Sequence, residues 1–180
     1  MIKIQTKRLL IRDPVFADLN GWHRLKSDAQ NMRFVEYLQT RTLEESRADL
    51  QKAVDAIEMN PRVKYFFSVV LNETGEFIGA IGFMTEAKED GLMGGVGWFF
   101  LPEHQGKGYA TEAFQAMIPF MFNDCAIDII DAGCKLANPA SERIMQKCGM
   151  KKIREYEDGT KAQYQLKRQE YFEINQLYCN

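Results

Sequence analysis

The sequence predicts an α+β fold, of the mixed α/β kind, in which helices pack on a largely antiparallel sheet. Strand-like runs rich in β-branched and aromatic residues are interspersed with segments of helical periodicity. Two such runs, 63–71 and 77–84, flank the turn sequence NETGE, which is typical of a hairpin. No internal repeat or flexible linker interrupts the 180 residues, so we expect one domain over 1–180.

Composition and charge narrow the class of protein. Hydrophobic residues make up 46% of the chain and charged residues 27%, as in soluble globular proteins. The net charge of −2 and the pI of about 5.8 argue against a broad nucleic-acid-binding surface. No signal-peptide core is found, and no run approaches the roughly 18 apolar residues of a membrane span. We therefore expect a cytoplasmic protein with neither nucleic-acid nor membrane partners.

The cysteines do not form a metal-binding pattern. Cys125, Cys134, Cys148 and Cys179 include no CxxC pair, and the chain has only two histidines. We therefore expect no metal site, and we interpret the thiols as reduced and mostly buried.

The first half of the chain contains two predicted helices. After a strand over 7–13, Asp13 suits a helix N-cap and Pro14 suits the first turn that follows it. The second helix is expected over 42–60, where Thr42 and Glu45 have the spacing of a capping box.

The second half begins with an unusual strand over 92–101. It contains Gly94, Gly95 and Gly97, and glycine inside a strand often marks a bulge or a close backbone approach. A helix with Pro119 inside its pattern follows, and we expect that proline to bend the helix or to end its regular part. The remaining elements are a strand, a helix capped by Asn138 and stopped by Gly149, and two strands, over 127–136, 138–149, 150–157 and 162–174.

A glycine turn joins the strand over 92–101 to the next helix. Gly106 and Gly108 flank Lys107 where the helix begins, and a helix N-terminus attracts phosphate through unpaired amides and a partial positive charge. The turn is therefore either a pyrophosphate cradle or a tight strand-to-helix turn without a ligand. A Walker A loop is excluded by Leu101 five residues before Gly106, and a dinucleotide fingerprint is disfavoured by Thr111 at its third small position.

The segment QGKGYA, at 105–110, matches Q/R-x-x-G-x-G/A, the acetyl-CoA pyrophosphate signature of the GNAT N-acetyltransferases. The segments TKRLLIRD, GEFIGAIGF, WFFLPEHQGKGYATEAF and NPASERIMQKCGMKK match in order, so the resemblance covers about 5–170. The chain resembles the branch that includes ribosomal-protein N-terminal acetyltransferases. The resemblance implies the GNAT fold, with a twisted, mostly antiparallel central sheet of about six to seven strands and about four flanking helices.

The resemblance also implies an acetyl-CoA site. The glycine turn and first helical turn would bind the pyrophosphate, and the backbone of a bulged strand would pair with the pantetheine arm, with Asn138 nearby. The implied residues are Trp98, Phe99, Phe100, Leu101, Gln105, Gly106, Lys107, Gly108, Tyr109, Ala110, Thr111, Asn138 and Ser141.

The catalytic residues are less well defined. Ser141 matches a serine that stabilises or protonates the leaving thiolate in this branch, and Met145 replaces the tyrosine that many relatives use. Gly95 stands where relatives often have an acidic residue, so Glu86 or a chain of waters is the candidate general base. His104 adjoins the motif, and we expect it to be exposed beside the cofactor.

Three functions are compatible with these sequence features. The first is an acetyl-CoA-dependent N-acetyltransferase of a peptide, protein or small-molecule primary amine, active as a monomer or homodimer. The missing acid at Gly95 motivates the second, a catalytically weak acyl-CoA-binding or regulatory module. The third is a nucleotide-binding protein that uses the glycine turn for ATP or NAD. The acidic residues Glu155, Glu157 and Asp158 are compatible with a cationic acceptor or with a solvated surface.

Overall fold

The structure is a computed structural model that describes the backbone of residues 1–177 and the side chains of residues 1–173. Cys179 lies outside the described residues. Within them the fold is mixed α/β, as expected, with an eight-stranded sheet whose hydrogen-bonded order is β1-β2-β3-β4-β5-β6-β8-β7. The strands are β1 (Lys3–Gln5), β2 (Leu9–Arg12), β3 (Lys64–Leu71), β4 (Phe77–Lys88), β5 (Gly91–Phe100), β6 (Ile129–Lys135), β7 (Lys151–Tyr156) and β8 (Lys161–Lys167). The strand beyond the expected number is β1, which precedes the first predicted strand.

The described residues form more helices than the sequence suggested. The short α2 and the last helix, α6, are additional to the predicted set, and four 3-10 turns accompany them. The α-helices are α1 (Leu19–Ser27), α2 (Ala29–Met32), α3 (Leu43–Asp55), α4 (Tyr109–Asn123), α5 (Pro139–Lys147) and α6 (Arg168–Leu177). The 3-10 turns are η1 (Phe16–Asp18), η2 (Glu36–Leu38), η3 (Ala56–Glu58) and η4 (Pro102–His104).

The chain divides into two compact units, and each is discontinuous in sequence. The first contains residues 1–83 and 97–116, and the second contains residues 84–96 and 117 onward. The chain therefore passes from one unit to the other inside β4, β5 and α4 rather than in a linker.

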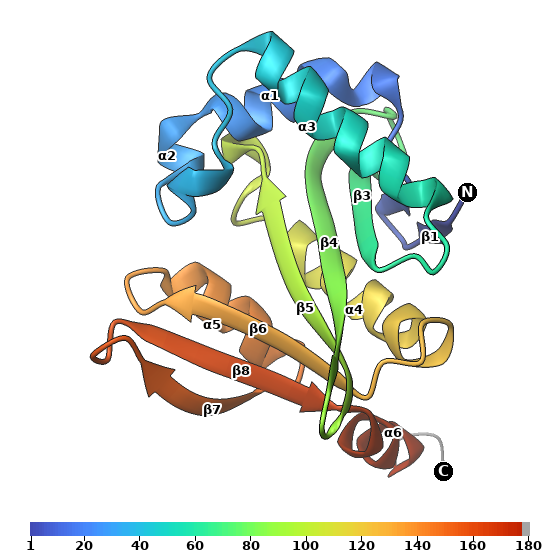
Figure 1. Cartoon of the computed structure of the whole chain (residues 1–180), viewed down its shortest axis with the longest axis vertical. Coiled ribbons are helices and arrows are strands. Elements are labelled where there is room, and N and C mark those ends of the chain that lie inside the picture. Colours follow the sequence, from blue (N-terminus) through green and yellow to red (C-terminus); the bar gives the residue numbers. More distant parts are fainter. Residues whose placement is uncertain (178–180) are drawn as a thin grey trace. The chain divides into compact units, whose positions relative to one another are not determined.

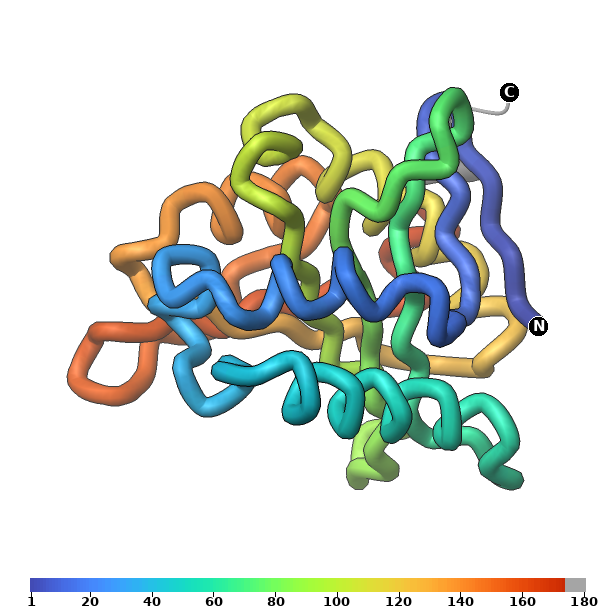
Figure 2. The backbone as a smooth tube through the Cα atoms, turned by 90° about the horizontal axis from the view of Figure 1, so that it is seen from above, coloured from blue at the N-terminus to red at the C-terminus, as the bar shows by residue number. Residues whose placement is uncertain are grey.

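The first unit has a core between two helices and the sheet. Helices α1 and α3 run side by side (Figures 1 and 2) and bury their apolar faces against β4 and the end of β5. Strands β1, β2 and β3 pair antiparallel, with Ile11 opposite both Ile4 and Val69. The buried members of this core are Leu19, Trp22, Leu25, Leu50, Ala53, Ala80 and Leu101.

One predicted cap is wrong and one is confirmed. Asp13 does not cap a helix, because the chain stays extended at Val15 and α1 begins only at Leu19. Instead Asp13 is fully buried and accepts hydrogen bonds from the Ile2 amide and the Arg62 guanidinium. Thr42 does cap α3, since its hydroxyl accepts from the Glu45 amide at 3.1 Å.

The second unit is built around β6 and β8, which pair antiparallel over seven positions from Ile129↔Lys167 to Lys135↔Lys161. The predicted strand over 162–174 is wrong in its second half, because β8 ends at Lys167 and α6 follows. The aromatic residues of α6 pack on α4: Tyr171 and Phe172 lie 5.3 and 6.2 Å from the Phe122 ring. This burial favours the helix over a continuation of the strand.

Pro119 lies inside α4, which continues past it to Asn123, so the helix does not end at the proline. No helix in the described part of the chain is long and apolar enough to cross a membrane.

Candidate functional site

The predicted glycine turn leads directly into α4, in the first unit. Gly106 and Gly108 have φ angles of +73° and +81°, a left-handed conformation that favours glycine. Helix α4 starts at Tyr109, and the Gly108 carbonyl accepts the first hydrogen bond of the helix, from the Glu112 amide. The amides of Tyr109 and Ala110 therefore have no intrahelical acceptor and stand at the positive end of a 15-residue helix.

The turn is open to its surroundings. Gly106, Lys107 and Gly108 are exposed, and a Cβ placed on Gly106 would meet no atom within 4 Å. The φ angles alone explain why glycine occupies 106 and 108. The exposure leaves the main chain of the turn accessible to an anion.

Gln105 holds the turn to the elements before it. Its side-chain amide donates to the Asn31 side-chain oxygen and to the Phe100 carbonyl, each at 2.8 Å. Asn31 in turn donates to the Leu25 carbonyl, so the end of β5 and α2 are tied to the start of the turn. The side-chain amide of Gln105 thus holds the turn in place through two hydrogen bonds to other parts of the protein.

The expectation that His104 is exposed is wrong. Its side chain is 9% exposed, and its Nε2 lies 3.4 Å from a carboxylate oxygen of Glu76. Its Nδ1 is buried and has no hydrogen-bond partner among the described residues. The 3-10 turn η4 places the ring against the protein, 6.2 Å from the Tyr109 ring, rather than in solvent.

The side chains at the end of β5 belong to the core of the first unit. Phe100 and Leu101 are buried, Phe99 packs on the helix-and-sheet core, and Trp98 lies 5.1 Å from the Phe114 ring. The side chains of Phe100 and Leu101 are therefore not accessible to a ligand, whereas Trp98 and Phe99 are half-buried.

The glycines of β5 have different explanations. A Cβ on Gly94 would come within 2.7 Å of Ile127 and 3.0 Å of Met121, so packing requires glycine there. A Cβ on Gly97 would meet nothing within 4 Å, and its φ is not in the left-handed region. Neither packing nor backbone strain accounts for glycine at position 97.

Strand β5 pairs with β6 over a short stretch only. The parallel register runs from Met93↔Ile129 to Gly95↔Asp131, while β5 itself continues to Phe100. The expected bulge and separation of the strands beyond Gly95 stay a prediction.

In the second unit, Asn138 and Ser141 open helix α5. The Asn138 side-chain oxygen accepts from the Ser141 amide at 3.3 Å, which confirms Asn138 as the N-cap. Ser141 is half-buried in the first turn, and Gly149, at φ +83°, stops the helix region as expected. Met145, at the position where relatives have a tyrosine, is fully buried.

A buried tyrosine that sequence reasoning missed lies next to this turn. Tyr164 of β8 donates its hydroxyl hydrogen to the Glu142 carboxylate, one residue after Ser141. Burial and the Glu142 carboxylate raise the pKa of Tyr164 to about 12. Tyr164 is therefore neutral at physiological pH, and its hydroxyl holds the Glu142 carboxylate.

The candidate acids are paired with lysines. Glu86 is 68% exposed and forms an ion pair with Lys88. Within β7, Glu155 pairs with Lys152, and Glu157, in the turn that follows, pairs with Lys161 of β8. These pairs offset the negative charge that would attract a cationic acceptor.

Sequence and structure comparisons identify the family. The model of the acetyltransferase (GNAT) domain matches residues 8–151. The chain belongs to the GNAT acetyltransferase family. It is 34% identical over 150 residues to the uncharacterized N-acetyltransferase YnaD of Bacillus subtilis, a match that covers 83% of this chain and 82% of that protein.

Solved GNAT structures have the same fold. A GNAT acetyltransferase from Bacillus anthracis is 27% identical, with a TM-score of 0.77 over 93% of this chain and 99% of the other. RimL, a ribosomal L7/L12 alpha-N-protein acetyltransferase solved with coenzyme A, gives a TM-score of 0.79 at 18% identity, over 94% and 99% of the two chains. The protein is thus an acyltransferase of the GNAT family. No cluster of three or more potential metal ligands is found in the part of this GNAT chain that the structure describes.

Proposed function

We propose that this protein transfers the acetyl group of acetyl-CoA to a primary amine by direct attack in a ternary complex. The acceptor class is a peptide or protein N-terminus or a small-molecule amine. The observation that carries the proposal is the exposed turn at Gly106 and Gly108, which presents main-chain amides at the start of a long helix in a GNAT chain.

The turn would hold the diphosphate of acetyl-CoA. Backbone amides at a helix N-terminus bind anions without a side chain, and Lys107 adds a positive charge beside them. The proposed diphosphate-binding residues are Gln105, through its main chain, and Gly106, Lys107, Gly108, Tyr109, Ala110 and Thr111.

The end of β5 would hold the pantetheine arm. The side chains of Phe99, Phe100 and Leu101 pack in the core, so main-chain groups of this segment would pair with an extended ligand. The Phe100 carbonyl and both main-chain groups of Leu101 already have protein partners, so the ligand would use the other main-chain groups of the segment. Trp98 contributes in the same way, and Gly97 lets the ligand come close to the strand.

We propose Ser141 as the group that stabilises or protonates the departing thiolate, with Asn138 contacting the pantetheine arm. The cap hydrogen bond from the Ser141 amide fixes the main chain at this position, so its hydroxyl projects from a defined turn. Glu86 is the proposed general base, directly or through water. Its ion pair with Lys88 occupies one of the two carboxylate oxygens, Oε1.

The amine acceptor is proposed by class. RimL is by name an acetyltransferase of a protein α-amino group, and a neutral primary amine is the nucleophile that this chemistry requires. We propose that the reaction takes place in the cytoplasm and that the protein acts as a monomer or homodimer.

A second candidate function is a catalytically weak acyl-CoA-binding module. It is favoured by Gly95, which supplies no acid on β5, and by the pairing of Glu86 with Lys88. Both candidates predict acetyl-CoA binding, and they differ in turnover.

Two measurements test the proposal. In thermal-shift titrations, acetyl-CoA should raise the melting temperature more than ATP or NAD at equal concentration, since binding to the native state stabilises it. Free-thiol release from acetyl-CoA should then exceed background with some member of a panel of primary amines, including peptides and polyamines. A larger shift with ATP or NAD would contradict the acetyl-CoA site, and binding without turnover would favour the module.

A further inference from the structure

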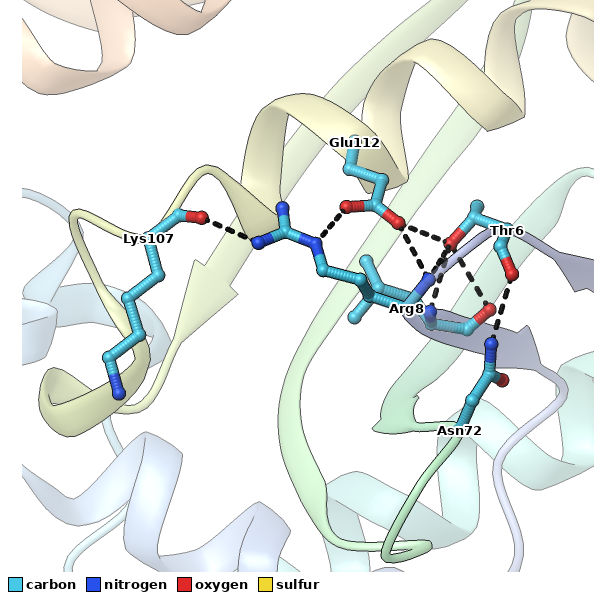
Figure 3. A network of polar contacts seen from close by, with 6 residues as sticks. Thr6, Arg8, Asn72, Lys107 and Glu112 are labelled. Atoms are coloured by element: carbon cyan, nitrogen blue, oxygen red, sulfur yellow. Dashed lines mark hydrogen bonds and ion pairs between the residues drawn. The ribbon is translucent and has the colours of Figure 1, made fainter.

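The glycine turn is braced by a polar network that begins far away in the sequence (Figure 3). Arg8, which lies between β1 and β2, donates from Nη1 to the Lys107 carbonyl at 3.1 Å. Its Nε donates to Glu112 Oε2 at 2.6 Å, and its main-chain amide donates to Glu112 Oε1 at 3.0 Å. Its guanidinium carbon also lies 4.5 Å from the centre of the Tyr109 ring. One side chain thus contacts the turn, the first helical residue and the first turn of α4.

Arg8 is itself held in place. Thr6 donates its hydroxyl hydrogen to Glu112 Oε1 at 2.6 Å, and it accepts from the Leu9 amide at 2.9 Å. Asn72 donates from its main chain to the Arg8 carbonyl and from its side chain to the Thr6 carbonyl, each at 2.9 Å. The main chain of Arg8 is therefore anchored, and its side chain, which is 42% exposed, is held by Glu112.

The charges in the network support one another. Burial acts to raise the pKa of Glu112, but hydrogen bonds from Thr6 and Arg8 and the Arg8 charge lower it overall. An ionised Glu112 in the first turn of α4 also interacts favourably with the positive end of the helix. Hydrogen bonds between charged groups are stronger than those between neutral groups, so Glu112 holds the Arg8 guanidinium more firmly than a neutral acceptor would.

The bond to the Lys107 carbonyl has a directional consequence. In a planar trans peptide the carbonyl and the amide of the same unit point in opposite directions. Because Arg8 fixes the Lys107 oxygen on its own side, the Gly108 amide of that peptide points away from Arg8. Gly108, at φ +81°, has no Cβ to restrict its backbone, so the bond from Arg8 to the preceding carbonyl limits the rotation of this peptide.

We propose that Arg8, held by Glu112, is a positioning residue that fixes the Lys107–Gly108 peptide so that the Gly108 amide is aimed at the diphosphate of acetyl-CoA. The proposal rests on the proposed function. It predicts that Arg8 acts on the part of the ligand that carries the diphosphate and has no effect on the rest.

The test compares two ligands on the full-length protein. Dissociation constants of acetyl-CoA and of S-acetylpantetheine, which lacks the diphosphate and nucleotide, are measured by calorimetry for wild type, Arg8→Met and Arg8→Lys. Arg8→Met should weaken acetyl-CoA binding by about tenfold to a hundredfold, the range expected for loss of a charge-assisted hydrogen bond. It should leave S-acetylpantetheine binding within about twofold. Arg8→Lys should be intermediate, because one ammonium cannot bond Lys107 and Glu112 in the fixed geometry of a guanidinium.

Arg24→Met is the matched control. Arg24 is an exposed arginine that pairs with Glu103, shortly before the turn, so its loss removes the same charge without touching Lys107 or Glu112. Acetyl-CoA affinity should stay within about twofold of wild type in this variant. If Arg8→Met does not fold, Glu112→Gln replaces it, since it keeps the shape and removes the charge that holds Arg8.

The outcomes separate the two proposals. A wild-type protein that does not bind acetyl-CoA overturns the proposed function. A wild type that binds, with an Arg8 variant that binds acetyl-CoA equally well or loses both ligands equally, overturns the positioning role of Arg8.

Discussion

Arg12 and Asp18 form a two-point ion pair, with Nη1 donating to Oδ2 at 2.8 Å and Nη2 to Oδ1 at 2.7 Å. The Asp18 carboxylate also accepts from the Val15 amide and from the Ser68 hydroxyl, at 3.0 and 2.7 Å. Asp18 is 6% exposed. This carboxylate therefore joins the end of β2, the start of η1 and β3 inside the first unit.

Asp18→Asn should destabilise the protein by about 3 kcal/mol, because it leaves the Arg12 charge without its partner in a largely buried place. Urea unfolding of both proteins at neutral pH measures the difference. The exposed pair of Arg24 and Glu103 is the control, and Glu103→Gln should change the free energy of unfolding by less than about 1 kcal/mol. Similar small losses in both variants would show that Asp18 is not a structural carboxylate.

The Asp18 carboxylate should also make the stability of the protein sensitive to acid. Burial acts to raise the pKa of Asp18, but hydrogen bonds from Arg12, Val15 and Ser68 and the Arg12 charge lower it below its ordinary 3.8. A group whose folded pKa is depressed contributes stability above its unfolded pKa, and that contribution is lost as pH falls through the folded pKa. We therefore expect the contribution of Asp18 to decline below about pH 4, and Asp18→Asn to have a shallower decline in urea midpoint there. Parallel declines would argue against this assignment.

Glycine substitutions separate backbone strain from ligand approach. Gly108→Ala places a side chain at φ +81° and should cost about 1 kcal/mol of stability. Gly97→Ala meets no neighbour and should change stability by less than about 0.5 kcal/mol.

The larger Gly97→Val should weaken acetyl-CoA binding by about tenfold, the equivalent of roughly one lost hydrogen bond. Calorimetric titration and thermal melts give the two quantities on the same sample. Unchanged affinity in Gly97→Val would indicate that no ligand approaches β5 at this position.

Ser141→Ala should lower kcat by about tenfold or more and leave the acetyl-CoA dissociation constant nearly unchanged, as expected for an interaction made mainly in the transition state. The cap bond to Asn138 uses the Ser141 main-chain amide, so the substitution preserves it. Steady-state kinetics with an accepted amine and a binding titration check the two parts. A variant with wild-type kcat would remove Ser141 from the mechanism.

Cys148 should resist thiol reagents in the folded protein. Burial raises its pKa to about 12, so almost no thiolate exists at pH 8. Burial also raises the pKa of Cys134, whereas Cys125 is only half-buried. Labelling followed by peptide mass spectrometry should show modification of Cys125 before Cys148, and modification of Cys148 only on unfolding. Early labelling of Cys148 would contradict its burial.

Local features could be predicted from the sequence because their causes lie within a few residues. Thr42 and Asn138 were identified as caps from the spacing to the amides they accept from. The start of α4 next to Gly108 could also be predicted, because a pair of glycines often marks a change of backbone direction.

Features that depend on distant partners could not be predicted. The segment after Lys167 alternates in a way compatible with a strand, and its contact with Phe122 of α4 decides for a helix. His104 follows a charged residue, and its burial depends on the turn η4. Arg8 and Glu112 are 104 positions apart, and no pattern in either segment indicates that they meet.

The two units of the chain are interleaved in sequence, since each is completed by a segment that follows part of the other. A contiguous gene fragment cannot encode either unit whole without including residues of its counterpart. Exchange of one unit between relatives would need three crossover points, one each inside β4, β5 and α4. A single crossover anywhere inside this chain should therefore split at least one of the two units.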